Sequence, residues 1–152
     1  IKIMADLVVT INESVTINGA LRGSSNSITT SNIVDTYERV LTAAHSNTTT
    51  IAVFGSTPHS AAGALDVENA SYIRITNLST TDAIYLAIVG TATNYTVKIR
   101  PEGSHMLFNG EEVFVAEADT SPGFTSFEDL ASVQVKPVGS TDCQIEMFVG
   151  LV

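Results

Sequence analysis

Histidine, cysteine and carboxylate side chains are the groups of this chain that could carry chemistry, and their spacing matches no catalytic motif. The three histidines, His45, His59 and His105, lie far apart. The sequence contains no HExxH, G-x-S-x-G or P-loop pattern and no Cys/His cluster at metal-ligand spacing. We therefore predict a protein that is not an enzyme, with no catalytic residues, no cofactor and no dedicated metal site.

The single cysteine, Cys143, has no partner for an internal disulfide and alternates with Ile145, Met147 and Val149. This period-two pattern predicts a small buried apolar residue on a strand. No His, Lys or Arg lies nearby in sequence to lower the pKa of its thiol, so we do not expect a nucleophile.

Four carboxylates gather at Glu111, Glu112, Glu117 and Asp119. A hard cation such as Ca²⁺ could use them together with loop carbonyls, but the D-x-[DN]-x-[DN]-G order of a dedicated calcium loop is missing. We favour a solvated turn and loop over a cation site.

Charge argues against two classes of partner. Sixteen acidic and seven basic residues give a formal charge of −9, which disfavours nucleic acid and anionic membranes. The sequence has no run of about 18 apolar residues, so it predicts no transmembrane helix. The N-terminus shows no signal-peptide pattern, so we expect synthesis in the cytoplasm.

The stretch from Ser71 to Pro101 predicts three consecutive β-strands, because apolar residues such as Ile73 and Ile75 alternate with polar ones. Its middle strand, residues 83–89, is apolar on both faces. Such a strand is either central and covered on both sides, or it has one face that meets another subunit.

The first third of the chain is less regular. Asp6 to Leu21 predicts two strands or one bent strand, with a turn at Asn18-Gly19. Arg22 to Asn32 is polar and predicts a loop or a weak edge strand. Ile33 to His45 has apolar spacing that fits a helix or a strand, and its Thr, Val and Tyr content favours the strand.

Two further local signals lie near the end of the chain. Asn109-Gly110 predicts a hairpin that joins residues 105–108 to residues 112–116. Ser126 precedes Asp129 by three residues, the spacing of a helix-capping pair, which predicts a short helical turn over Phe127 to Ala131.

Turn signals recur every 8 to 12 residues or so without a long helical period. The sequence therefore predicts an all-β protein, an antiparallel β-sandwich or jelly-roll-like single domain. We assign residues 1–9 to an N-terminal arm or first-strand extension and residues 10–152 to the β-sandwich domain.

Four segments carry a resemblance to a known group of proteins. Residues 72–78 (YIRITNL), 83–88, 129–133 (DLASV) and 145–150 (IEMFVG) are similar to small β-sandwich virion proteins of tailed bacteriophages of marine and cyanobacterial hosts. The resemblance covers residues 64–152 best, and its motifs are strand patterns.

The resemblance implies a virion structural protein, a decoration or cement protein on the outer surface of the assembled head, with a tail or head-fibre component as the alternative. It implies the major capsid protein or another virion protein as partner, and a homo-oligomer, with a trimer favoured. Fibre modules bind host glycan, which here would rest on Tyr37, Tyr72, Tyr85 or Tyr95, because the chain has no Trp.

Three surfaces are the predicted protein interface: the N-terminal arm, one face of residues 83–89, and the loop with two phenylalanines. The residues that we assign to this interface are Leu7, Val9, Ala83, Tyr85, Ala87, Val89, Phe124 and Phe127.

Overall fold

The structure, a computed structural model, describes residues 4–56, 63–118 and 120–152, and these residues form strands and no helix. The predictions that fall on Ile1 to Ile3, His59 and Asp119 lie outside the described residues. The strands are β1 (Ala5–Asn12), β2 (Val15–Ile17), β3 (Ala20–Arg22), β4 (Ser25–Ile33), β5 (Asp35–Ala43), β6 (Thr49–Gly55), β7 (Ala64–Asp66), β8 (Ala70–Asn77), β9 (Ile84–Val89), β10 (Asn94–Ile99), β11 (Ser104–Leu107), β12 (Ser132–Pro137) and β13 (Cys143–Leu151).

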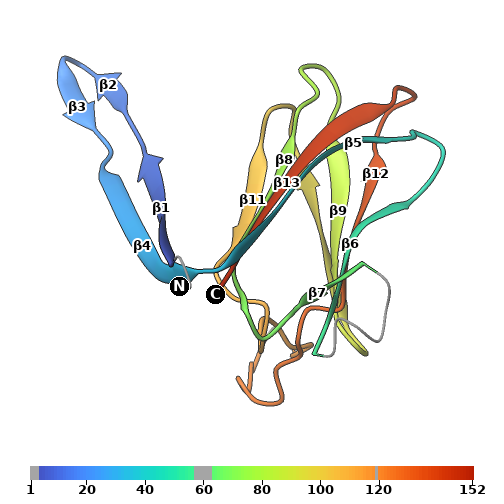
Figure 1. The fold of residues 1–152 in the computed structure, drawn as a ribbon. Coiled ribbons are helices and arrows are strands. Elements are labelled where there is room, and N and C mark those ends of the chain that lie inside the picture. The colour runs from blue at the N-terminus through green and yellow to red at the C-terminus, as the bar shows by residue number, and fades with distance from the viewer. Residues whose placement is uncertain (1–3, 57–62, 119) are drawn as a thin grey trace.

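Strands β5 to β13 form two packed sheets, which confirms the predicted all-β sandwich (Figure 1). One sheet has the order β11-β8-β13-β5 and the other β10-β9-β12-β6-β7. The antiparallel pairs are nested along the chain, because β5 pairs with β13, β6 with β12, β8 with β11 and β9 with β10. This nesting is the strand order of a jelly roll, with β7 added in parallel to β6.

The core lies between the two sheets and consists of alternate residues along the strands, as the period-two patterns predicted. Tyr37 adds a polar link across it, because its hydroxyl donates to the Ile51 carbonyl at 3.2 Å. Cys143 is 1% exposed, which confirms its predicted place in the core. The core residues without measurable exposure are Ala43, Ile73, Ile75, Ile84, Leu86, Ile88, Val133, Ile145, Met147 and Val149.

Strand β9, which the sequence predicted to be apolar on both faces, is central within its sheet, with β10 on one side and β12 on the other. Ile84, Leu86 and Ile88 point into the core. The other face is on the outside of the sandwich, where Tyr85 is 43% exposed.

The predicted hairpin at Asn109-Gly110 is wrong. Strand β11 pairs with β8 instead, and residues 112–116 make only an isolated bridge, between Phe114 and Glu128. Gly110 is required for close packing: its N–H donates to the Ala70 carbonyl at 3.0 Å, and a Cβ at this position would lie 2.7 Å from the Val67 carbonyl oxygen. The glycine therefore permits a close backbone approach and makes no hairpin turn.

The predicted helical turn over Phe127 to Ala131 is also wrong. Glu128 is extended and bridges to Phe114, and the Asp129 carboxylate accepts the N–H of Glu112 at 3.0 Å rather than capping a helix. Tertiary pairing of this segment outweighs the local capping signal.

Candidate interaction surface

Residues 5–33 form one β-hairpin whose register is set by the turn Asn18-Gly19. Both turn residues have positive φ, 52° and 79°, as a type I′ turn requires. The pairs from Ile17↔Ala20 down to Leu7↔Thr30 are all symmetric about this turn. Arg22 to Asn32, for which a loop or a weak edge strand was predicted, therefore contains a long strand, β4. The boundary that we drew after residue 9 falls inside β1.

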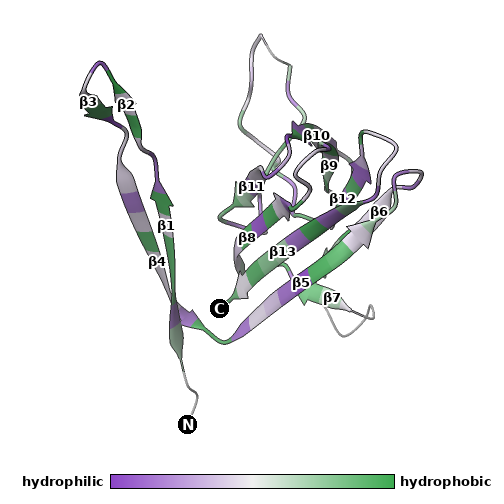
Figure 2. Ribbon diagram, turned by 90° about the horizontal axis from the view of Figure 1, so that it is seen from above, coloured by the Kyte–Doolittle hydropathy of each residue, from purple (hydrophilic) through white to green (hydrophobic). Residues whose placement is uncertain are grey.

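One face of this hairpin, which we call the arm (residues 4–33), is apolar. Leu7, Val9 and Ile11 share a face with Ile28, since directly paired residues point the same way. Val15 and Ile17 continue the alternation towards the tip. On the opposite face polar side chains prevail, and Thr10 is hydrogen-bonded to Ser27 at 2.8 Å. Figure 2 shows β1 as mostly hydrophobic along its length and β4 as paler.

The arm is richer in exposed apolar side chains than the sandwich. It has 30 of the 142 described residues but seven of the sixteen large apolar residues that are strongly exposed. Interfaces are recognised by contiguous exposed apolar surface, whereas scattered apolar residues need no explanation. The seven are Met4, Val8, Ile11, Val15, Ile17, Leu21 and Ile28.

The arm projects beside the sandwich and touches it mainly at its base (Figures 1 and 2). There Ile33 is buried, and Leu7 lies so close to Gly150 that a Cβ at position 150 would be 2.9 Å from the leucine Cδ2. Above the base the arm and the sandwich enclose an open cavity of about 460 Å³, continued by a second of about 230 Å³ that shares Val9 and Ile11. We call the two together the arm groove.

The wall of the arm groove opposite the arm is the outer face of the β11-β8-β13-β5 sheet. Tyr72, Met106 and Phe148 line the larger cavity, and Phe108 lines the smaller. Tyr72 packs against both phenylalanines, with ring centroids 5.5 Å from Phe108 and 6.0 Å from Phe148. Arg74 is the one charged residue that lines the two cavities, and it forms an ion pair with Glu146. The groove is thus apolar on both walls, with its charge neutralised.

The predicted interface residues fall in three separate places. Leu7 and Val9 lie on the groove side of the arm. Phe124 and Phe127 lie in the loop at the lower end of the sandwich in Figure 1, where they are 72% and 37% exposed. The remaining four lie on or beside β9 in the other sheet: Ala83, Tyr85, Ala87 and Val89.

Sequence reasoning missed the aromatic wall of Tyr72, Phe108 and Phe148. These residues come from three segments far apart in the chain, and the pairing of β8 with β11 and β13 is what brings them together. It also missed the partner of β1. A signal for that partner was present, because reflection of Val9 through the Asn18-Gly19 turn points to Ile28.

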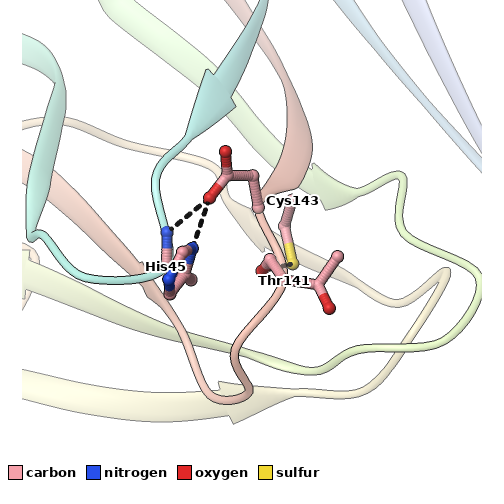
Figure 3. Close-up of polar contacts among 4 residues, drawn as sticks. His45, Thr141 and Cys143 are labelled. Atoms are coloured by element: carbon pink, nitrogen blue, oxygen red, sulfur yellow. Dashed lines mark hydrogen bonds and ion pairs between the residues drawn. The ribbon is translucent and has the colours of Figure 1, made fainter.

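His45 and Cys143 come from distant parts of the chain and lie near each other, but they do not form a catalytic group. The Asp142 carboxylate accepts hydrogen bonds from the His45 backbone N–H at 2.9 Å and pairs with its ring Nδ1 at 2.7 Å (Figure 3). The buried thiol of Cys143 donates to the Thr141 carbonyl at 3.8 Å instead. Burial raises the pKa of the thiol, which keeps it protonated and unreactive at neutral pH.

His105 is engaged by a single tyrosine. Its Nε2 is 3.0 Å from the Tyr95 hydroxyl, and the two rings pack edge-on at 5.9 Å. Burial lowers the pKa of His105 and raises that of Tyr95, so both groups are neutral near pH 7. This hydrogen bond joins β10 to β11, and the group bonded to His105 is a tyrosine hydroxyl rather than a serine or cysteine nucleophile.

Glu111, Glu112 and Glu117 belong to the carboxylate group for which the sequence favoured a solvated turn and loop over a cation site. In the ranges 4–56, 63–118 and 120–152 no three His, Cys, Asp or Glu side chains are grouped closely enough to hold a metal ion. Glu128, which the sequence did not single out, holds the turn between β9 and β10: its carboxylate accepts the N–H groups of Ala92 and Thr93 at 3.2 and 3.0 Å. Burial alone would raise the pKa of Glu128, but these hydrogen bonds lower it overall.

Comparison with known proteins gives no assignment: the chain matches no protein-family model, no curated protein and no solved structure. None of the described residues belongs to a helix long and apolar enough to cross a membrane.

Proposed function

We propose that this protein is a non-enzymatic virion structural protein that decorates the assembled head of a tailed bacteriophage and stabilises it. The observation that carries the proposal is the arm: a hairpin with an apolar face that its own sandwich leaves open to solvent. A two-stranded hairpin is marginally stable alone, so a hairpin of this kind is suited to contact with a neighbouring protein.

Three further observations support a structural role. Jelly rolls are common in viral capsid proteins, although a fold by itself does not define a function. The formal charge of −9 suits the outer surface of a head better than a position against packaged DNA. Among the described residues, His45, His105 and Cys143 are hydrogen-bonded to Asp142, Tyr95 and Thr141. None of these three contacts pairs a nucleophile with a base.

The proposed partner is the major capsid protein or another virion protein, and the decorating unit is a homo-oligomer, with a trimer favoured. A protein that binds only the assembled lattice stabilises that lattice by mass action, in proportion to its concentration relative to its Kd. The loop with Phe124 and Phe127 and the outer face of β9 are the surfaces that we assign to the head, and the arm is the surface that contacts a neighbouring protein of the assembly.

Co-sedimentation with empty phage heads tests the proposal. We expect the full chain to pellet with expanded heads and to raise the temperature at which they break. Phe124→Ser should weaken this binding, whereas Val53→Ser, at an apolar site on β6 that is 41% exposed against 72% for Phe124, is the control. Full chain that stays in the supernatant at saturating concentration refutes head decoration.

A second candidate is a tail or head-fibre module that binds host glycan. The observation that favours it is Tyr85, the most exposed of the four tyrosines, which borders a surface hollow of about 250 Å³ together with Thr96, Gln134 and Lys136. An exposed ring beside polar groups is typical of sugar sites. On a glycan array, Tyr85→Ala should abolish binding and Tyr85→Phe should retain it. Full chain that binds no glycan excludes this candidate.

A further inference from the structure

We propose that copies of this protein associate by exchanging arms: the apolar face of one arm packs in the arm groove of a second copy. This inference goes beyond head decoration, because it concerns the contact between copies and holds whatever surface the assembly covers.

The arm cannot bury its whole apolar face against its own sandwich. Between Val9 or Ile11 and the aromatic wall lies the arm groove, and its larger cavity of about 460 Å³ is open space rather than a packed contact. Neither cavity reaches Val15 and Ile17 at the tip, which are 51% and 54% exposed. A second body is needed to cover the whole face.

A second copy fits this role because each chain carries both complementary surfaces. The arm offers a row of aliphatic side chains, and the sandwich offers the wall of Tyr72, Phe108 and Phe148. Such pairs of surfaces join copies head to tail and give a closed ring when the rotation between copies closes, and exchange of an identical element is a known route to dimers.

The distribution of charge also favours a second copy of the chain as the occupant of the arm groove. Two copies of a chain with a net charge of −9 repel each other, so self-association requires surfaces with little net charge. The arm contains only Asp6, Glu13 and Arg22 as charged residues. On the opposite wall the charge of Arg74 is paired with Glu146. The arm and the wall are therefore surfaces where two copies can meet without strong repulsion.

The hinge for the exchange lies at the junction of β4 and β5. A single residue, Val34, separates the two strands, and its N–H donates to the Leu151 carbonyl at 2.8 Å. Asn32, two residues before it, has a positive φ of 68°, an uncommon conformation, and lies where the register between β1 and β4 shifts at the base of the arm. The arm therefore leaves the sandwich at a fixed point, and its exchange leaves the jelly-roll pairing of β5 with β13 in place.

Two exposed neighbours on β4 provide the first test. Ile28 lines the groove, whereas Thr29 points to the opposite face. By light scattering of the purified protein we expect the wild type to be a closed oligomer. Ile28→Asp should weaken its association about 100-fold or more, because a charge would be buried in an apolar contact. Thr29→Asp adds the same charge on the other face and should leave the mass unchanged. A monomeric wild type, or an Ile28→Asp variant with the mass of the wild type, overturns the proposal.

Cross-linking between chains tests the occupant of the groove. Ile28→Cys and Phe108→Cys are made in separate chains, one of them isotope-labelled, then mixed and oxidised. Both positions line the same cavity, so exchange predicts a disulfide that joins position 28 of one chain to position 108 of the other. Cys143 is buried and does not compete. If the heavy and light chains give no such link, arm exchange is refuted.

These experiments use no phage heads and can therefore fail independently of the proposed function. An oligomer with cross-linked arms that ignores heads supports the exchange and refutes decoration. A monomer that pellets with heads supports decoration and refutes the exchange.

Discussion

A variant that lacks residues 1–32 and begins at Ile33 is expected to keep its jelly roll folded. The arm contributes little to the sandwich because their contact is confined to the base, chiefly Leu7 over Gly150. Leu7 is only partly buried, so its loss costs about 1 kcal/mol, against a domain stability of roughly 5–15 kcal/mol. For a domain of this size that corresponds to a decrease in Tm of about 3–6 °C.

The same deletion has a much larger effect on association. The exposed aliphatic side chains of the arm are on average about half exposed. Full burial of one such side chain contributes about 1.5–3 kcal/mol, so covering the remaining half of the four on the groove face (Ile11, Val15, Ile17 and Ile28) contributes roughly 3–6 kcal/mol. The deletion thus removes most of the free energy of association and little of the free energy of folding.

Chemical denaturation with circular dichroism measures the folding part. The reference is Ile28→Asp, because it keeps the arm while blocking association, so two monomeric chains are compared. The truncated chain should unfold in one cooperative transition with a free energy of unfolding about 1 kcal/mol below the reference. Loss of cooperativity, or a decrease above about 4 kcal/mol, would mean that the arm is part of the sandwich core and would refute this reasoning.

Three further predictions concern the sandwich. Asn77→Ala should lower the free energy of unfolding by about 2–3 kcal/mol, because the buried amide makes three hydrogen bonds to loop backbone. The pKa of His105 is lowered by burial beside Tyr95, so the unfolded chain binds more protons below pH 6.5 or so, and stability should decrease as pH falls through that value; His105→Phe should flatten this dependence. The pKa of Asp142 is lowered by the backbone N–H and then the ring of His45, so its contribution is present above about pH 4 and is lost in stronger acid; Asp142→Asn should remove that acid-dependent part.

Urea denaturation at several pH values checks all three. An Asn77→Ala variant within 0.5 kcal/mol or so of the wild type would contradict the account of that amide. The account of His105 fails if wild type and His105→Phe lose stability in parallel between pH 7 and pH 5. Equal stability losses of wild type and Asp142→Asn between pH 5 and pH 2 would show that the contact with His45 contributes nothing.

The sequence contained enough to predict the sheets but not their partners. Strands with one wet face, such as those with Ile73 and Ile75 or with Val97 and Ile99, are visible because burial forces every second residue to be apolar. The pairing of β5 with β13 joins Asp35 to Leu151, and no local pattern records such a distant contact. The jelly-roll order could therefore be suggested only from the regular spacing of the turn signals along the sequence.

The two local errors have a common cause. Asn109-Gly110 and the Ser126–Asp129 pair are valid signals for an isolated peptide, but both segments are held by backbone bonds to other parts of the chain. For Arg22 to Asn32 the sequence left a loop or a weak edge strand open, and the second is correct: β4 has few large apolar residues and is an edge strand whose only partner is β1. The aromatic wall of the arm groove was beyond sequence reasoning, since it exists only after three strands meet.

The nested pairing has a consequence for the order in which the molecule can form. β13 lies between β5 and β8, so one sheet lacks an inner strand until the chain has been made as far as Leu151. The arm depends only on residues close to its own turn, and hairpins of this kind close in microseconds, whereas sheets built from distant strands take milliseconds to seconds. During synthesis the strands of the arm can therefore begin to pair before the sandwich is complete, although the isolated hairpin is only marginally stable. A copy that meets a neighbour too early presents an apolar hairpin without a finished groove to receive it, which makes the rate of synthesis and the concentration of chains determinants of correct assembly.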